Sequence, residues 1–161
     1  MRTDADANRA IELYSNTIRR ICMIHLKNYS DTEDIFQEVF LKYILSPAIF
    51  DTAEYEKAWF IRVTINACKD LLKSAFRKKT VPLEIIKEQQ DNLTSSDSEV
   101  LTAILSLDKK YKNVIYLYYY EGYTAVEIGK LLNKNVNTIY TLLNRGKNIL
   151  KQSLGGDEYE E

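Results

Sequence analysis

The stretch EGYTAVEIGKLLNKNVNTIYTLLNRGKNIL, residues 121–150, constrains the fold more than any other part of the sequence. Gly122 has no Cβ and can therefore end a preceding helix in the left-handed conformation. Thr124 and Glu127 have the spacing of a capping box, in which each side chain hydrogen-bonds the other residue's backbone amide. Apolar residues follow at helical spacing. The segment therefore predicts a short helix that begins directly after Thr124.

A second helix is predicted after the polar turn at residues 133–135, where Asn135 is a suitable N-cap. One side of this helix is apolar: Val136, Ile139, Leu143, Gly146 and Leu150. The other side, which we call the recognition face, carries amides, hydroxyls and basic groups: Asn137, Tyr140, Thr141, Asn144, Arg145 and Lys147. Two short helices joined by a tight turn make a helix-turn-helix.

The recognition face has the chemistry that a DNA major groove requires. Amides and hydroxyls can hydrogen-bond base edges, and Arg and Lys can neutralise phosphates. An ordinary helical hairpin with a solvated outer face would show the same pattern. The remainder of the chain has to decide between these two interpretations.

The composition predicts an all-α protein with one domain or two small ones. The chain has 161 residues, of which 45% are hydrophobic, and it contains only 5 Gly and 2 Pro. No apolar run approaches the roughly 20 residues of a membrane span, and the N-terminus has no signal-peptide stretch. Cys22 and Cys68 match no metal-binding spacing and are expected to be buried thiols. A cytoplasmic protein without membrane insertion is expected.

Two helices are predicted before residue 46. The first, from about residue 5 to 27, has an apolar face: Ile11, Tyr14, Ile18, Ile21 and His25. The second begins at Ser30, which has Glu33 at capping-box spacing. Its outer side, which we call the acidic face, mixes acids, an amide and one aliphatic residue: Asp34, Gln37, Glu38 and Leu41. Such a face is either simply solvated or, given the exposed Leu41, a surface for a partner.

A third helix is predicted from about residue 55 to 78, after a loop in which Asp51 or Thr52 can cap it. Net charge is −1, but the excess of basic over acidic residues is concentrated between residues 62 and 79, where Asp70 is the only acidic residue. We call one of its sides the basic stripe: Arg62, Asn66, Lys69, Lys73 and Arg77. With Trp59 near its start, this pattern is typical of a nucleic-acid-binding face. The alternative is a solvated lysine-rich side with Trp59 in the core.

The chain divides at an acidic, polar segment. Residues 80–97 are predicted to be a linker between a first domain, residues 1–79, and a second domain, residues 98–154. Residues 155–161 are expected to be a disordered tail.

In the order of these parts the chain resembles the small two-domain sigma factors of bacterial RNA polymerase, the extracytoplasmic-function group of the sigma-70 family. Residues 31–43, DTEDIFQEVFLKY, resemble region 2.2 of the family. Residues 57–79 resemble regions 2.3 and 2.4, and residues 107–150 resemble region 4. The paired order of these regions is far more specific than either region alone.

This resemblance implies a promoter-specificity subunit with no catalytic residue, cofactor or metal. The acidic face would bind the β′ clamp helices of core RNA polymerase. Trp59 and the basic stripe would bind the minus-ten element of promoter DNA, and the loop at residues 46–56 could hold a flipped base. The recognition face would bind the minus-thirty-five element, and region 4 would also meet the β flap. An anti-sigma factor is a further partner that the resemblance implies.

The sequence departs from the family at residues 140–142, where a Lys-Ser-Arg type of triplet is common. Tyr140 and Leu142 replace the two basic residues, which puts phosphate and base contacts from this helix in doubt. Arg145 and Lys147 match the basic positions of the family.

Two other classes of function stay open at this point. An autonomous helix-turn-helix regulator would normally dimerise to read two half-sites, and no clear dimerisation element is present. A metal protein or enzyme could use Glu33, Asp34 and Glu38, but helical di-metal sites require Glu-x-x-His pairs, and His25 follows Cys22 at that spacing. The first alternative is therefore the stronger of the two.

Overall fold

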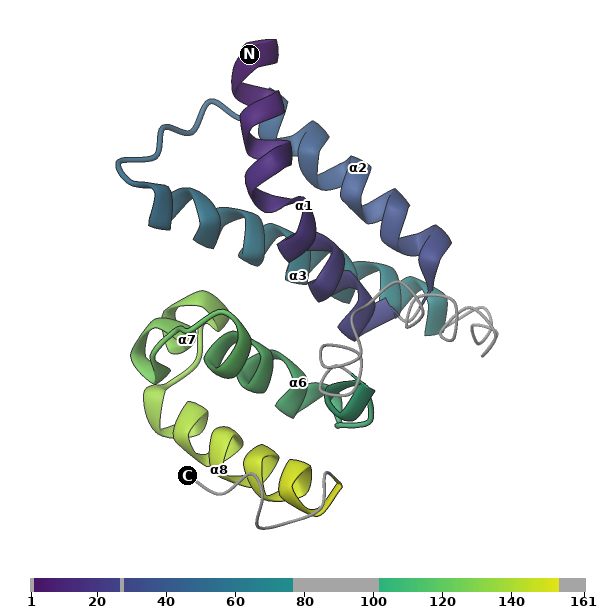
Figure 1. Cartoon of the computed structure of the whole chain (residues 1–161), viewed down its shortest axis with the longest axis vertical. Coiled ribbons are helices and arrows are strands. Elements are labelled where there is room, and N and C mark those ends of the chain that lie inside the picture. Colours follow the sequence, from purple (N-terminus) through teal and green to yellow (C-terminus); the bar gives the residue numbers. More distant parts are fainter. Residues whose placement is uncertain (1, 27, 77–101, 154–161) are drawn as a thin grey trace. The chain divides into compact units, whose positions relative to one another are not determined.

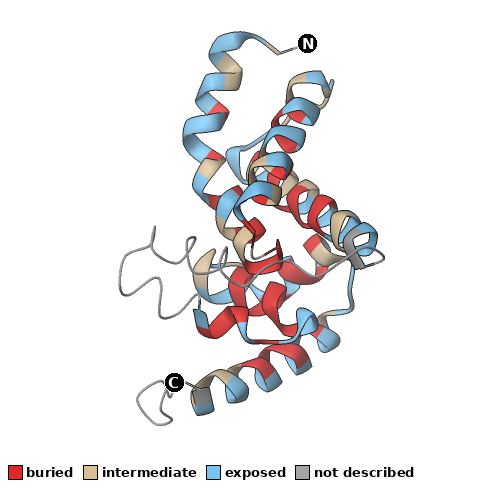
Figure 2. Ribbon diagram, turned by 90° about the vertical axis from the view of Figure 1, so that its right-hand side faces the viewer, coloured by how far each residue is buried: buried red, intermediate tan, exposed pale blue. Residues whose placement is uncertain are grey.

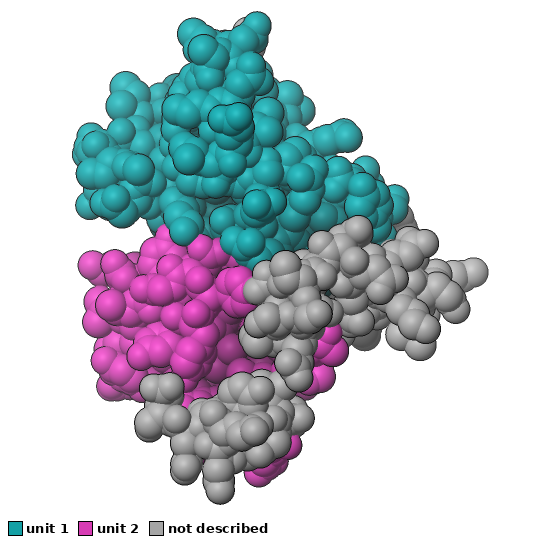
Figure 3. Space-filling model, viewed as in Figure 1, with its two compact units in different colours: residues 1–92 teal, residues 93–161 magenta. Residues whose placement is uncertain are grey.

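The computed structural model describes residues 2–26, 28–76 and 102–153. Within these ranges all regular structure is helical, and the chain divides into two compact units, residues 1–92 and 93–161 (Figure 3). The all-α class with two small helical domains is thereby confirmed. The linker predicted at residues 80–97 and the tail at 155–161 lie outside the described residues.

In the first unit three helices pack against one another: α1, Asp4–Leu26; α2, Tyr29–Leu45; and α3, Ala53–Phe76 (Figure 1). Each of them has buried positions on one side and exposed positions on the other (Figure 2). The predicted positions of the first and third helices agree with α1 and α3. Thr52 caps α3, because its Oγ accepts the Tyr55 amide at 3.2 Å.

The start of α2 differs from the prediction. Its N-cap is Asn28, whose side-chain oxygen accepts the Asp31 amide at 3.0 Å, and Ser30 lies inside the first turn. Both residue types are good caps. Thr32 is buried, and its hydroxyl donates to the Asn28 carbonyl at 2.8 Å.

The core of the first unit is aromatic at its centre. Phe60 on α3 is fully buried, and its ring lies 4.7 Å from that of Tyr14 and 4.8 Å from that of Tyr43. Cys22 and Cys68 are both buried free thiols, as predicted, and their sulfur atoms are 3.9 Å apart between α1 and α3. The predicted apolar face of the first helix is wrong at Ile11, which is exposed.

The second unit contains the helix-turn-helix. Helix α6, Lys109–Ile115, continues into a π-helical turn, η1, Tyr116–Tyr120, and is followed by α7, Ala125–Leu132, and α8, Val136–Ser153. Helix α8 packs against both α6 and α7. Gly122 adopts the predicted left-handed conformation, with φ of 78°.

Side-chain hydrogen bonds cap the first turn of α7 and the first turn of α8. The capping box is present: the Glu127 amide donates to Thr124 Oγ at 3.2 Å, and the Thr124 amide donates to Glu127 Oε1 at 2.9 Å. Asn135 caps α8 as predicted, since its side chain accepts the Asn137 amide at 2.8 Å. In the turn between α7 and α8 the chain passes so close to Gly129 that a Cβ there would lie 2.8 Å from the Lys134 carbonyl oxygen.

None of the helices in the described ranges is both long and apolar enough to cross a membrane.

Candidate nucleic-acid interface

The basic stripe lies on the solvent-exposed side of α3. Its members within the described residues are all exposed: Arg62, Asn66, Lys69 and Lys73. The adjoining side of the helix is buried through Ile61 and Ile65. Arg77 lies outside the described residues. The apolar side of α3 therefore docks the helix and leaves an amide and three cationic side chains accessible to an anionic polymer.

Trp59 belongs to the edge of the aromatic core. Its ring packs edge-on against that of Phe60, with 5.1 Å between the ring centroids. The centroids of the Tyr43 and Phe50 rings lie 5.8 and 6.0 Å from that of Trp59. The side chain is only half-buried. The indole therefore supports the fold and keeps part of its surface accessible, and its role in nucleic-acid binding stays a prediction.

The acidic face is exposed along α2. All four of its residues are accessible, and Leu41 is 57% exposed. Ile35 and Val39 are buried on the opposite side. Leu45, one turn beyond Leu41, is 61% exposed and extends this apolar edge. Leu45 was not predicted to belong to this surface, although its spacing of four from Leu41 places it on the same side of the helix.

On α8 five residues of the recognition face are exposed, and the sixth, Lys147, is half-buried. The Thr141 hydroxyl donates to the Asn137 carbonyl at 3.1 Å, so it is satisfied by its own helix in the free protein. Leu142, where the resemblance led us to expect Arg, is buried. The hydrophobic residue at this position therefore adds to the packed side of α8 and contributes nothing to the recognition face.

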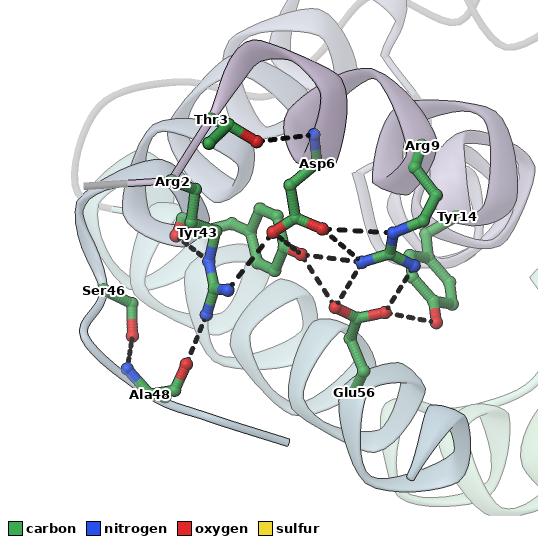
Figure 4. Close-up of polar contacts among 9 residues, drawn as sticks. All are labelled: Arg2, Thr3, Asp6, Arg9, Tyr14, Tyr43, Ser46, Ala48 and Glu56. Atoms are coloured by element: carbon green, nitrogen blue, oxygen red, sulfur yellow. Dashed lines mark hydrogen bonds and ion pairs between the residues drawn. The ribbon is translucent and has the colours of Figure 1, made fainter. Parts of the chain in front are cut away.

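A polar network that the sequence analysis did not identify joins the start of α3 to α1 (Figure 4). Glu56 is buried, and its carboxylate accepts two hydrogen bonds from the Arg9 guanidinium, at 3.0 and 2.8 Å. The hydroxyls of Tyr14 and Tyr43 also donate to Glu56, at 2.9 and 2.7 Å. Asp6 accepts from Arg9 Nε at 3.1 Å. One buried carboxylate thus ties all three helices together.

The network shifts the acid–base behaviour of its members. Burial acts to raise the pKa of Glu56, but the hydrogen bonds from Arg9, Tyr43 and Tyr14 outweigh it and lower that pKa. The pKa of Asp6 is lowered chiefly by its hydrogen bond from Arg9. Burial and the neighbouring Glu56 raise the pKa of Tyr14 to about 12. Glu56 is therefore held as an anion and Tyr14 as a neutral donor.

A hollow of about 400 Å³ opens beside this network, at the loop between α2 and α3. The loop contributes Ile49, Phe50, Asp51 and Thr52 to its lining, and the other walls include Arg2, Arg9 and Glu56. It includes part of the loop at residues 46–56, which the resemblance suggested could hold a flipped base.

The acidic residues considered for a metal site do not gather into one. Among the described residues no group of three or more His, Cys, Asp or Glu side chains has an arrangement that could hold a metal ion. Glu33 instead pairs with Arg19 at 3.3 Å, and Glu38 pairs with Lys42 at 3.0 Å.

Comparison with known proteins decides between the remaining interpretations. Two family models match the chain in order, Sigma-70 region 2 over residues 10–78 and Sigma-70, region 4 over residues 97–150. The chain belongs to the sigma-70 family. The region 2 match contains the acidic face and the described part of the basic stripe, and the region 4 match contains the recognition face.

Individual members of the sigma-70 family are similar to this chain over most of its length. The ECF RNA polymerase sigma factor SigW of Bacillus subtilis (strain 168) is 26% identical, over 89% of this chain and 86% of its own. The RNA polymerase sigma factor SigV of the same strain is 27% identical, over 84% of this chain and 82% of its own.

A solved structure shares the fold. It is the sigma factor RpoE from Bartonella quintana, in complex with the anti-sigma factor NepR. Its TM-score is 0.74 with 16% sequence identity, and the match covers 94% of this chain and 98% of that one.

Proposed function

We propose that this sigma factor acts in the cytoplasm as a non-catalytic subunit of RNA polymerase, which binds the core enzyme and directs it to promoters. The observation that carries this proposal is the order of the two sigma-70 regions along the chain. The exposed faces of α2, α3 and α8 fall within those regions and would supply the contacts that such a role requires.

Two domains would divide the task. Residues 1–79 would bind core polymerase and the minus-ten element, residues 80–97 would be the linker, and residues 98–154 would bind the minus-thirty-five element. The family matches, which end at residue 78 and resume at residue 97, support these boundaries.

The acidic face would bind the β′ clamp helices. Its carboxylates are exposed and lie beside two aliphatic side chains, Leu41 and Leu45, that are more than half exposed. Apolar anchors next to charges fit a protein partner, because burial of the anchors supplies affinity while the charges fix the partner's orientation. Leu45 is our addition to this surface.

The basic stripe would bind the opened minus-ten element. Its Arg and Lys side chains can neutralise phosphates, and the exposed part of Trp59 offers a surface on which an unpaired base can stack. The hollow at the α2–α3 loop is of a size to hold a flipped base.

The recognition face would contact the minus-thirty-five duplex, and the same domain would meet the β flap. Asn137 and Asn144 offer amides for base edges, and Arg145 offers a phosphate or guanine contact. Tyr140, which is 52% exposed, would take the place of a basic residue of the family. We also expect an anti-sigma factor among the partners, as in the RpoE–NepR complex.

Run-off transcription with core polymerase tests this function. Purified chain and a bacterial core enzyme would be supplied with a library of promoter fragments randomised at both elements. We expect transcripts from a defined subset of fragments that depends on the chain. Sequence-specific DNA binding by the chain alone, with no effect on polymerase, would instead favour an autonomous regulator.

A further inference from the structure

The loop between α2 and α3 is fastened by one residue that precedes α1. The Arg2 amide donates to the Ile44 carbonyl at 3.2 Å. The Arg2 side chain donates from Nε to the Tyr43 carbonyl at 2.8 Å and from Nη2 to the Ala48 carbonyl at 2.5 Å. These carbonyls belong to the last turn of α2 and to the loop that follows it; the Tyr43 carbonyl also accepts the Ser46 amide at 3.2 Å, so Arg2 adds a second donor at the end of the helix.

Aromatic contacts fix the same guanidinium. The Arg2 Cζ atom lies 4.1 Å from the centroid of the Tyr43 ring and 5.5 Å from that of Phe50. Cationic groups within about 6 Å of a ring centroid are attracted to it. A third nitrogen of the guanidinium, Nη1, faces Asp6 at 3.4 Å, and the side chain is only 15% exposed. Arg2 is thus held from several sides.

This attachment leaves the tip of the loop exposed to solvent. The Ala48 amide donates to Ser46 Oγ at 3.1 Å, and Thr52 caps α3, so both ends of the loop are fixed. Ile49, between them, is 90% exposed. A loop that is pinned at its ends and projects an apolar side chain is preorganised for binding, since less conformational entropy has to be lost when a ligand arrives.

We infer that Arg2 is a positioning residue for promoter recognition: it holds the α2–α3 loop, including Ile49, in the conformation that receives the opened minus-ten strand. This inference rests on the proposed function and adds to it a residue outside the matched sigma-70 regions. Its guanidinium acts through backbone carbonyls, so the shape of the side chain matters as well as its charge.

The first test measures the loop in the free protein. Amide hydrogen exchange of residues 46–52 would be compared in the wild type, Arg2→Ala, Arg2→Lys and Arg19→Ala. Arg19 is a matched control: it lies over the Phe36 ring at 4.2 Å and pairs with Glu33, but it contacts the start of α2. We expect faster exchange in the loop for both Arg2 variants and unchanged exchange for Arg19→Ala. Loop exchange in Arg2→Ala equal to that of the wild type overturns the inference.

The second test measures recognition by the holoenzyme. Each variant would be joined to core polymerase and used in competitive transcription from fragments randomised at the minus-ten element or at the minus-thirty-five element. We expect Arg2→Ala to keep wild-type affinity for core and its minus-thirty-five preference, and to lose about tenfold of its discrimination between minus-ten bases. Arg2→Lys, which has one donor nitrogen in place of three, should behave like Arg2→Ala.

Two results in this assay contradict the positioning role. Wild-type discrimination by Arg2→Lys would show that only the charge matters, as expected for a phosphate contact. An equal loss at both promoter elements would indicate a general structural defect. Failure of the wild-type chain to direct transcription would refute the proposed function, and the exchange experiment would still test whether Arg2 holds the loop.

Discussion

Glu56 on α3 is the side chain that joins all three helices of the first unit through hydrogen bonds. It is buried, and its carboxylate accepts hydrogen bonds from Arg9 on α1, Tyr14 on α1 and Tyr43 on α2. Removal of one member of such a hydrogen-bond network leaves the remaining polar groups without a partner at a site that is largely shielded from water.

Glu56→Gln should therefore destabilise the first unit. The amide keeps one acceptor oxygen, but it has no charge and turns an NH₂ group toward donors. We expect a loss of about 2 kcal/mol in the free energy of unfolding, measured by urea titration of the fluorescence of Trp59, the only tryptophan. Glu54→Gln, at an exposed position of the same turn, should change it by less than about 0.5 kcal/mol. Equal stability of the two variants would contradict this role for Glu56.

The lowered pKa of Glu56 also predicts how stability depends on pH. The unfolded chain, whose Glu residues titrate near about 4.3, takes up this proton before the folded protein does. The contribution of Glu56 is present above that pH and is lost as the pH falls through its lowered pKa in the folded state. Urea midpoints between pH 6 and pH 3 should fall more steeply for the wild type than for Glu56→Gln.

Other acids titrate in the same range but are shared by both proteins. The pKa of Asp6 is lowered by Arg9, and that of Asp31 is raised by burial and by Asp34. The contribution of Asp31 is common to both proteins and cancels in the comparison, whereas Asp6 shares Arg9 with Glu56 and belongs to the network that the comparison measures. Parallel pH profiles for wild type and Glu56→Gln would show that Glu56 is not held as an anion.

At the scale of the elements, signals within a few residues of one another were readable from the sequence. The Thr124–Glu127 capping box and the Asn135 cap depend only on neighbours along the chain, and both are present. The start of α2 was misplaced because Ser30 has the right local spacing. Asn28 is an equally suitable cap two residues earlier, and its side chain accepts the Asp31 amide.

Long-range polar contacts were not readable. Arg9 and Glu56 are separated by 47 residues, and Arg2 and Ala48 by 46. Nothing in the local pattern distinguishes these side chains from solvated charges at the ends of helices. The partners become neighbours only when α1 crosses the start of α3, so the network and the attachment of the loop follow from tertiary packing alone.

The turn between α7 and α8 depends on the absence of a side chain at Gly129. A Cβ there would lie 2.8 Å from the Lys134 carbonyl oxygen, and the backbone would have to move. Gly129→Ala should lower the stability of the second unit by about 2 kcal/mol, measured by amide exchange of α7 and α8. Lys130→Ala, at the next and exposed position, is the control. Unchanged exchange in Gly129→Ala would mean that the turn relaxes without cost.

The acidic face allows a direct test of core binding. Asp34→Lys combined with Glu38→Lys reverses two exposed charges and leaves the buried side of α2 intact, so the protein should fold normally. Like charges at an interface cost several kcal/mol, and we expect co-elution with core polymerase to be lost. Asp4→Lys with Glu12→Lys makes the same charge change on exposed residues of α1 and should retain it. Wild-type co-elution of the first variant would exclude this surface.

For the whole molecule, we expect weak DNA binding in the absence of polymerase. The sequence from residue 99 onward has equal numbers of basic and acidic side chains, and Leu142 is buried at a position that is commonly basic. Because phosphate neutralisation supplies most nonspecific affinity, the free chain should bind duplex promoter DNA with a dissociation constant of about 10⁻⁴–10⁻⁶ M at physiological salt. A fluorescence titration that gave nanomolar, sequence-specific binding would contradict this expectation.

The two thiols between α1 and α3 make the first unit a reporter of its own opening. Cys22 and Cys68 are the only cysteines in the sequence, and both are 0% exposed. A thiol-specific reagent can reach them only when these helices separate. The labelling rate therefore reports how often the first unit opens. The second unit contains no cysteine and therefore does not contribute to the labelling. Any partner that holds the first unit closed must slow the labelling, and its affinity can be read from that rate without an engineered probe.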